Sequence, residues 1–304
     1  MGKHIHFLHG GRASYPEVAA YARYFEKRFT VTEGNMDACR AVPREDLVLW
    51  CIMGLYPSRR CASYVIHDYR SLSVEPFAAV KDGLKRFVNA QPDLRIFQNS
   101  AIEEVLGFCD GAPSVHLPMG LPEWIGEIEK QPKLYDFGYL GAVNKDRGFD
   151  QIFESFLGRY DGRRTMLIIG PCEDAILRRW GGEAALTFMG ALPQREALGK
   201  ITAARVALAL FPNHRPHCWQ TPTKLLEYAA LRLPIIANES AMVRTVAESL
   251  SVPIKFVGEQ LFGDLEFGDE LWGERFEGDL SALYWPSVIA DSRVEHAICN
   301  DAQR

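Results

Sequence analysis

The sequence predicts an α/β protein built from two doubly wound units, each with a parallel sheet covered by helices on both faces. Short apolar runs alternate with longer stretches of helical periodicity along the chain, as in parallel sheets with crossover helices. With 304 residues, 47% of them hydrophobic, the chain is long enough for two domains. A polar segment rich in Gly and Pro at 121–133 divides it almost in half, so we expect a linker there.

The predicted elements follow the chain in order. In the first half, apolar runs rich in β-branched and aromatic residues predict strands at 5–9, 46–51, 63–67, 95–98 and 114–117. Amphipathic stretches between them predict helices at 15–28, 76–89 and 101–108. In the second half, the same reasoning predicts strands at 135–140, 165–169, 186–189, 206–211, 234–237 and 254–257. The predicted domains are 1–125 and 126–285, followed by a terminal helix at 286–304.

Composition and charge exclude several classes of protein. The net charge of -5 lacks the basic footprint of a nucleic-acid binder, so we expect no nucleic-acid partner. Seven scattered cysteines without paired spacing indicate free thiols in a reducing compartment. No apolar run approaches the roughly 20 residues that span a bilayer. We therefore expect a cytoplasmic protein, with peripheral contact at the inner face of a membrane as a further possibility. An acidic stretch at 259–279 predicts a solvated loop or lid.

The segment 221–237 is the most informative in the chain. Thr221 and Pro222 predict the start of a helix that opens after the strand at 206–211. Helix N-termini at the carboxyl ends of parallel strands favour phosphate binding. Lys224 in the first turn would add a positive charge, and Glu227 on the same face could accept hydrogen bonds from ribose hydroxyls. The alternative is an ordinary amphipathic core helix with an exposed Lys and Glu.

This segment resembles the nucleotide-binding motif of the large retaining family-four (group 1) glycosyltransferases. The shared pattern is a small residue, Pro, any residue, Lys, two apolar residues, Glu and an aromatic residue, then Pro before a β-branched strand. The resemblance implies the GT-B fold, in which two Rossmann-like domains face each other across a cleft and a C-terminal helix crosses back to the first domain. It also implies that Thr223, Lys224 and Glu227 bind a nucleotide-diphosphate sugar.

Two further matches extend the resemblance through the second half. The strand ending at Gly141, followed by Arg147, looks like the start of the family's C-terminal domain, and Arg147, or else Lys145, would join Lys224 on the diphosphate. Gly190 and Ala191 resemble the turn that lies beside the nucleotide base, although a plain strand followed by a Gly-Pro turn is the alternative. The segment from 284 resembles the terminal crossover helix.

The first half matches the family mainly in layout. Gly10 and Gly11 end the first strand in a flexible turn where backbone can approach a sugar or phosphate. His67 and Asp68 end a later strand, where related enzymes place a His or an acid facing the donor sugar. A structural histidine at a strand end is the alternative.

One position departs from the family pattern. Retaining members carry a Glu that contacts the donor sugar eight positions before the ribose-binding Glu, and here that position is Trp219. His214, Arg215 or His217 could take over this contact, and a positive group there suits an acidic sugar. The chain also lacks an Asp-any-Asp triplet, the usual cation-binding pair of single-Rossmann transferases. We therefore expect no metal ion and no cofactor besides the donor substrate.

These residues predict a glycosyltransferase that acts on a glycan or lipid-linked acceptor, in surface polysaccharide or glycolipid synthesis. If configuration is retained, the donor diphosphate deprotonates the acceptor while Arg147 and Lys224 stabilise the leaving group. If configuration is inverted, Asp68 is the candidate base. A sugar-nucleotide epimerase of the same architecture and a nonenzymatic sugar-nucleotide or glycan-binding subunit remain as alternatives. A dinucleotide-dependent dehydrogenase is disfavoured because no Gly-x-Gly-x-x-Gly follows the first strand of either half.

The predicted helix at 76–89 allows two interpretations. Basic residues stand beside large apolar ones, here Lys81, Lys85, Arg86, Phe77, Leu84 and Phe87. Such a helix could lie on a membrane that holds a lipid-linked acceptor. The ordinary interpretation is a helix whose apolar face joins the core.

Overall fold

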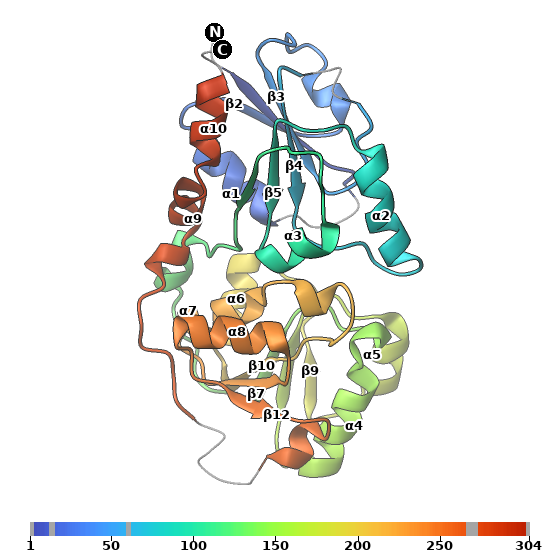
Figure 1. The fold of residues 1–304 in the computed structure, drawn as a ribbon. Helices are drawn as coiled ribbons and strands as arrows, with labels where there is room; N and C mark the ends of the chain where they lie inside the picture. The colour runs from blue at the N-terminus through green and yellow to red at the C-terminus, as the bar shows by residue number, and fades with distance from the viewer. Residues whose placement is uncertain (1–2, 12–15, 59–61, 266–272, 302–304) are drawn as a thin grey trace. The chain divides into compact units, whose positions relative to one another are not determined.

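The computed structural model describes residues 3–11, 16–58, 62–265 and 273–301 (Figure 1). The chain divides into two compact units. The first unit comprises Met1–Pro122, Trp219–Thr221 and Ser281–Arg304, and the second comprises Glu123–Cys218 and Pro222–Leu280. The first break between them lies at the Gly- and Pro-rich segment in which the sequence predicts a linker. The centre of the acidic stretch, 266–272, is outside the described residues, as are 12–15 of the predicted first loop and helix.

The first unit contains a six-stranded parallel sheet in the order β2-β1-β3-β4-β5-β6. Its strands are β1 (His4–Leu8), β2 (Thr30–Gly34), β3 (Leu47–Ile52), β4 (Tyr64–Tyr69), β5 (Leu94–Phe97) and β6 (Ser114–His116). The central strands β3 and β4 are buried along their whole length. The sequence prediction missed β2, because an edge strand that reads Thr-Val-Thr-Glu-Gly lacks the apolar run that marks the others.

Helices from both ends of the chain cover this sheet. They are α1 (Pro16–Phe25), α2 (Ala78–Val88), α3 (Ser100–Leu106), α9 (Trp285–Asp291) and α10 (Val294–Asp301). The two C-terminal helices pack beside α1 (Figure 1). The Tyr24 hydroxyl donates a hydrogen bond to Glu295 at 2.9 Å, and the rings of Tyr21 and Trp285 are 5.6 Å apart. The expected return of the C-terminal helix to the first domain is therefore confirmed.

The second unit repeats the architecture with a parallel sheet in the order β12-β11-β10-β7-β8-β9. Its strands are β7 (Tyr135–Leu140), β8 (Met166–Ile169), β9 (Leu186–Phe188), β10 (Ala204–Ala209), β11 (Ile235–Asn238) and β12 (Lys255–Val257). Its helices are α4 (Phe149–Tyr160), α5 (Asp174–Trp180), α6 (Gln194–Ile201), α7 (Thr223–Ala230) and α8 (Ala241–Leu250). Aromatic rings fill the core on the α4 side, where Phe137 lies 5.8 Å from Phe156 and 5.4 Å from Phe262. Two parallel α/β units thus confirm the predicted fold class.

Within the described residues, no helix combines the length and the apolar character that a membrane crossing requires.

Candidate functional site

Helix α7 begins at the edge of the second sheet where the parallel strands end. The chain leaves β10 at Ala209 and enters α7 at Thr223, so the helix N-terminus stands at the carboxyl edge of the sheet. Pro222 is the N-cap, and not Thr221 as the sequence suggested; the Thr221 amide instead donates to Gln98 Oε1 at 2.7 Å. No side chain caps α7 in the described part of the chain. The Leu225 amide donates to Pro222 O at 2.9 Å, and the N-terminus of the helix still presents Thr223 and Lys224 to an anion.

Lys224 is half-buried at this edge, between two aromatic rings. Its Nζ donates to the Tyr139 hydroxyl at 2.8 Å and lies 4.2 Å from the centre of that ring. The ring of Phe211 is 5.0 Å away on the loop after β10. Burial lowers the pKa of Lys224. The aromatic faces and the Tyr139 hydroxyl thus hold a cation where a phosphate would reach the helix N-terminus.

Glu227 follows one turn later and is only 7% exposed. Its Oε1 accepts a hydrogen bond from Gln194 Nε2 at 3.0 Å, and burial raises the pKa of this carboxyl to about 7. Among the described residues, no ion pair joins Lys224 to Glu227. The two groups are therefore held apart, and each keeps hydrogen-bonding capacity for a ligand.

Glycines at the ends of neighbouring strands let the backbone approach Lys224. Gly141 follows β7 with a φ of +140°, and a Cβ there would lie 2.8 Å from Lys224 Cε. Gly170 follows β8 with a φ of +139°, and a Cβ there would lie 2.2 Å from the Gly141 carbonyl oxygen. The Gly170 amide donates to Gly190 O at 2.7 Å. The edge beside Lys224 is thus made of closely packed backbone that a side chain would disrupt.

Arg147 adds a second cation to the same edge. It ends the short helix Lys145–Arg147, which Asn144 caps by accepting a hydrogen bond from the Arg147 amide at 3.0 Å. Within the described residues, its guanidinium makes neither a hydrogen bond nor an ion pair. After burial, its charge contributes to lowering the pKa of Lys224, as expected for two cations at the same edge of the sheet. Lys145, the alternative partner, is exposed.

His214 connects the loop between β10 and α7 with the segment that carries Arg147. Its Nδ1 lies 3.0 Å from Arg215 O and its Nε2 lies 3.1 Å from Asp146 O. A carbonyl oxygen only accepts hydrogen bonds, so both contacts form together only when both ring nitrogens carry protons. These carbonyls raise the pKa of His214, and its ring lies 5.7 Å from that of His217. Both contacts favour the protonated ring, and the positive role of this loop toward a donor sugar stays a prediction.

The remaining predicted residues of the second unit lie on the same edge of strands. Gly190 and Ala191 are exposed after β9, and Gly190 has a φ of +69° with open space around it. Thr223 is the half-buried first residue of α7. Trp219, the position at which the family carries an acid, belongs to the first unit, where its carbonyl accepts a hydrogen bond from Asn99 Nδ2 at 3.0 Å.

The candidate residues of the first unit do not form a comparable site. Asp68 is 0% exposed, accepts a hydrogen bond from the Trp50 indole at 3.0 Å, and lies 3.8 Å from Arg70. Burial raises the pKa of Asp68 to about 6. His67 is also buried, with its ring 5.5 Å from that of Tyr56. All six residues of β4 are buried, and the role of His67 and Asp68 toward a substrate stays a prediction.

Gly10 and Gly11 form an exposed turn after β1, and Gly11 has a φ of +64° with open space around it. They belong to the first unit and are not among the residues gathered around α7.

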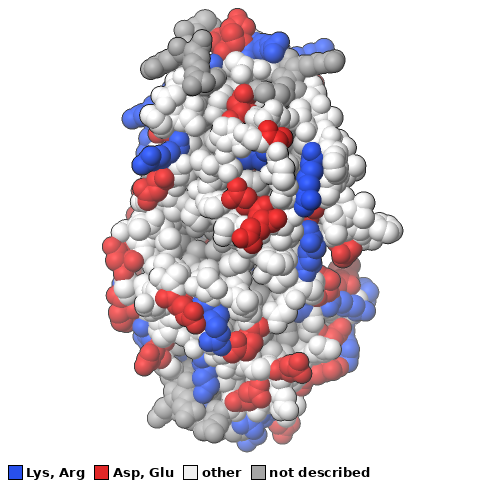
Figure 2. All heavy atoms as spheres, viewed as in Figure 1, with Lys and Arg blue, Asp and Glu red and all other residues white. Residues whose placement is uncertain are grey.

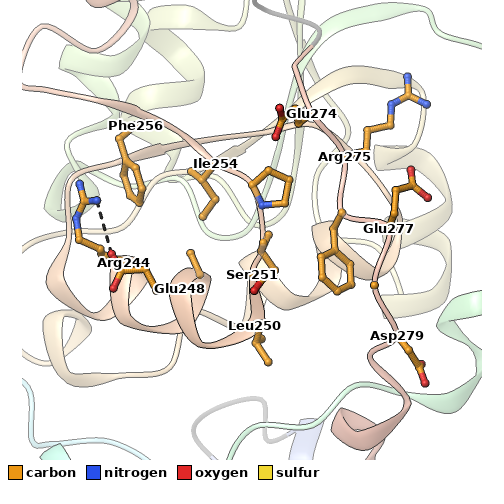
Figure 3. A pocket seen from close by; sticks show the side chains of 15 residues that line it. Arg244, Glu248, Leu250, Ser251, Ile254, Phe256, Glu274, Arg275, Glu277 and Asp279 are labelled. Atoms are coloured by element: carbon orange, nitrogen blue, oxygen red, sulfur yellow. Dashed lines mark ion pairs between the residues drawn. The ribbon is translucent and has the colours of Figure 1, made fainter.

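Two sizeable cavities open on the second unit. One, of about 940 Å³, lies at the carboxyl ends of β10, β11 and β12 and is lined by Arg147, Phe211 and Asn238 among others. The other, of about 700 Å³, lies between the end of α8 and residues 274–279 (Figure 3). Its lining mixes Arg244 and Arg275 with several carboxylates, and it contains none of the predicted site residues. The first cavity places open volume beside Arg147 and the Phe211 ring that packs on Lys224.

No protein-family model matches the chain, and no curated protein matches its sequence. Solved structures do match. The glycosyltransferase AviGT4 of avilamycin A biosynthesis is 13% identical, with 99% of each chain covered and a TM-score of 0.58. Anabaena HepE, solved with UDP and glucose, is 10% identical over 99% of this chain and 97% of its own, with a TM-score of 0.61.

The chain has the GT-B fold. This fold is not confined to transferases, since UDP-N-acetylglucosamine 2-epimerase from Rickettsia bellii matches 100% of this GT-B chain and 96% of its own at 10% identity, with a TM-score of 0.59. At such identities the likeness establishes the fold, and the chemistry has to be argued from the site.

Sequence reasoning missed residues that surround Lys224 and Glu227, among them Tyr139, Gln194 and Gly170. Tyr139 and Gln194 hold Lys224 and Glu227, and Gly170 packs against Gly141. Gly170 could have been found, because it ends an apolar run just as Gly141 does. The two partners could not, since they come from β7 and α6, far from α7 in sequence. Among the described residues, no cluster of three or more His, Cys, Asp or Glu side chains is arranged to hold a metal ion.

Proposed function

We propose that this chain is a glycosyltransferase that moves a sugar from a nucleotide-diphosphate sugar to a glycan or lipid-linked acceptor, in surface polysaccharide or glycolipid synthesis. The observation that carries the proposal is the pair on α7. Lys224 is held over aromatic rings at the helix N-terminus, and Glu227 is buried one turn later without an ion pair to it. The cation would bind the diphosphate of a nucleotide, and the carboxylate one turn away would accept hydrogen bonds from its ribose.

The chemistry follows from where charge develops. When the bond between sugar and diphosphate breaks, negative charge accumulates on the leaving diphosphate. Lys224, Arg147 and the N-terminus of α7 would stabilise that charge, and His214 would add to the positive field when it is protonated. Whether the sugar is retained or inverted depends on the acceptor-side base, and the burial of Asp68 argues against assigning it that role.

Nucleotide binding tests the donor site directly. Calorimetric titration of UDP, GDP, CMP and ADP should show one nucleotide binding in the micromolar range, lost in Lys224→Ala and in Glu227→Ala. Lys200→Ala and Glu196→Ala are matched controls, because both residues are exposed on α6 of the same unit. These controls should bind as the wild type does. Binding of no nucleotide, or equal binding by all five proteins, would remove the proposal.

We also propose that transfer needs no metal ion, because side-chain cations and a helix N-terminus supply the charge that a divalent cation would. Turnover should persist in excess EDTA. Loss of turnover that magnesium restores would contradict this point and leave the nucleotide site intact.

An epimerase is the second candidate, favoured by the full-length match to the Rickettsia enzyme. Incubation of the bound sugar nucleotide without acceptor separates the two functions. Conversion of the sugar under these conditions indicates an epimerase, and product formed only with an acceptor indicates a transferase. Binding without turnover over a broad acceptor panel indicates a nonenzymatic binding subunit.

A further inference from the structure

Half of the large hydrophobic side chains that are exposed among the described residues lie on or just before one helix, α2. They are Val74, Phe77, Val80, Leu84 and Phe87. From Phe77 onward their spacing of three and four residues places them on one face of the helix. Phe77 is 73% exposed and Phe87 is 86% exposed. An apolar face of this kind, open to solvent, marks an interaction surface.

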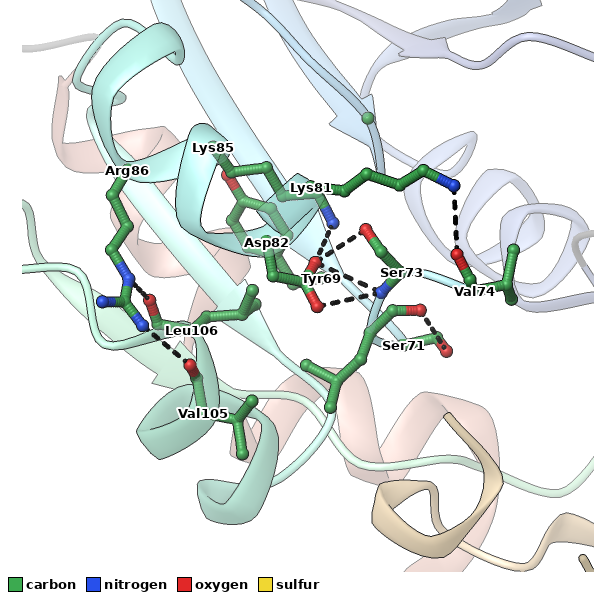
Figure 4. A network of polar contacts seen from close by, with 12 residues as sticks. Tyr69, Ser71, Ser73, Val74, Lys81, Asp82, Lys85, Arg86, Val105 and Leu106 are labelled. Carbon is green, nitrogen blue, oxygen red and sulfur yellow. Dashed lines mark hydrogen bonds and ion pairs between the residues drawn. The ribbon is translucent and has the colours of Figure 1, made fainter. Parts of the chain in front are cut away.

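The opposite face of α2 is polar and points inward. Asp82 and Lys85 are buried and joined by an ion pair of 2.7 Å (Figure 4). Asp82 also accepts hydrogen bonds from the Ser73 amide and, at 2.7 Å, from the Ser73 hydroxyl. The helix is therefore inverted relative to an ordinary surface helix, because its charged pair is anchored in the protein and its hydrophobic side chains face out. The core-facing interpretation of this helix is wrong.

The charge that α2 itself exposes is positive, and one exposed acid, Glu75, lies just before the helix, where it accepts a hydrogen bond from the Ala78 amide at 3.2 Å. Lys81 and Arg86 are exposed, whereas the sole acid of the helix, Asp82, is buried against Lys85. Lys81 Nζ donates to Val74 O at 3.1 Å and so lies beside the apolar face, whereas Arg86 turns to α3, where its Nη2 donates to Val105 O at 3.0 Å. Figure 2 shows Lys and Arg side chains next to α2 and an uncharged surface at the outer end of this helix. This local charge contrasts with a chain whose net charge is -5.

The backbone adds an independent observation at Phe77. This residue caps α2 with a φ of 62°, a left-handed conformation that is rare for a bulky side chain. Such strain persists only where the surroundings enforce it, and it concentrates at functional positions. Here its effect is to set an aromatic ring at the surface beside the apolar face.

We propose that this face of α2 docks into the interfacial region of an anionic lipid membrane. Helices that bind such membranes carry Phe and Leu on one face and basic residues on the rest of the helix, as α2 does with Lys81 and Arg86. The positive charge of Lys81 and Arg86 is complementary to anionic headgroups. The exposed apolar side chains can insert between lipids. The proposal goes beyond the transfer reaction and does not depend on it, because its test reads binding alone.

Vesicle sedimentation with the full chain tests the proposal. The wild type should bind vesicles of phosphatidylcholine with phosphatidylglycerol, and bind vesicles of phosphatidylcholine alone much less. The double variant Leu84→Gln and Phe87→Gln should lower binding at least tenfold. Lys81→Gln should lower it about fivefold, as expected for one cation near an anionic surface. The matched control is Leu134→Gln with Leu177→Gln, two leucines exposed in the second unit, and it should bind as the wild type does.

Three results would overturn the proposal. The first is no binding of the wild type to anionic vesicles, and the second is equal binding by the wild type and the α2 variant. The third is a wild-type dimer in sedimentation velocity that the α2 variant dissociates, without vesicle binding by either, which would make the face an interface between copies. Nucleotide titration of the α2 variant should match the wild type, so failure here is distinguishable from failure of the proposed transfer.

Discussion

Helices α2 and α7 each carry a lysine and a buried acid three residues apart, but the partners of the two pairs differ. On α2, Lys85 and Asp82 are joined directly at 2.7 Å. On α7, Lys224 turns to the Tyr139 hydroxyl and Glu227 to the Gln194 amide, with no ion pair between them in the described structure. In the first pair the two charges bind each other and anchor helix α2 in the protein. The second is held by neutral groups and stays open to a ligand.

The partners of a charged pair, rather than the spacing of its residues, therefore decide its role. In a directly joined buried pair, the mutual attraction of the two charges offsets the cost of their desolvation. Neutral partners such as Tyr139 and Gln194 compensate less, so burial raises the pKa of Glu227 to about 7 and lowers that of Lys224. Burial thus disfavours the charged forms of the α7 pair, as expected of a binding site without its ligand.

Breaking the closed pair should have the largest effect. Lys85→Met leaves the Asp82 carboxylate buried without its cation, and we expect the free energy of unfolding in urea to fall by about 3–5 kcal/mol. The double variant Asp82→Asn with Lys85→Met should recover part of the loss, because no charge is then stranded. A loss below about 1 kcal/mol in Lys85→Met, the range of a surface pair, would show that the pair is not closed as described.

Removing the lysine of the open pair should affect binding rather than stability. Lys224→Met should weaken nucleotide binding about 100-fold, within the range of charge-assisted hydrogen bonds, while the unfolding midpoint stays near that of the wild type. Calorimetry and urea unfolding measure the two effects. A large loss of stability with unchanged affinity would make α7 a structural helix like α2.

Crowding the open pair from the backbone should give a smaller effect. Gly141→Ala places a Cβ 2.8 Å from Lys224 Cε at a φ of +140°, so the lysine must move. We expect nucleotide affinity to fall about tenfold in titrations, equivalent to about 1.4 kcal/mol. Gly162→Ala is the matched control, because Gly162 also has a positive φ, +72°, but open space around it. Equal affinities in the two variants would show that crowding of Lys224 is not the cause.

The smallest effect is a pH dependence of the open pair. The pKa of Glu227 is 4.5 in the unfolded chain and about 7 in the folded chain. Its contribution to stability is therefore full below pH 4.5. This contribution is lost as pH rises toward 7, by up to about 1.4 kcal/mol per unit. Glu227→Gln should remove that slope in urea unfolding measured from pH 5 to 8. Nucleotide affinity should change in the opposite direction and improve from pH 6 to 8, because the ionised carboxylate is the better acceptor. Parallel slopes in the wild type and the variant would assign the titration to another group.

Sequence by itself determined the α/β alternation, the two units and the positions of most strands, because buried parallel strands are continuous apolar runs. It also singled out Lys224 and Glu227, since a helix N-terminus after a buried strand is recognisable from local residues, and a family resemblance added Gly141 and Arg147. The tertiary structure alone decided which groups these residues contact and which faces are covered. Tyr139, Gln194 and the buried surroundings of Asp68 depend on strands and helices that are distant in sequence. The outward apolar face of α2 depends on the same kind of contact, because periodicity shows that a helix has two faces, and only packing decides which one turns to the core.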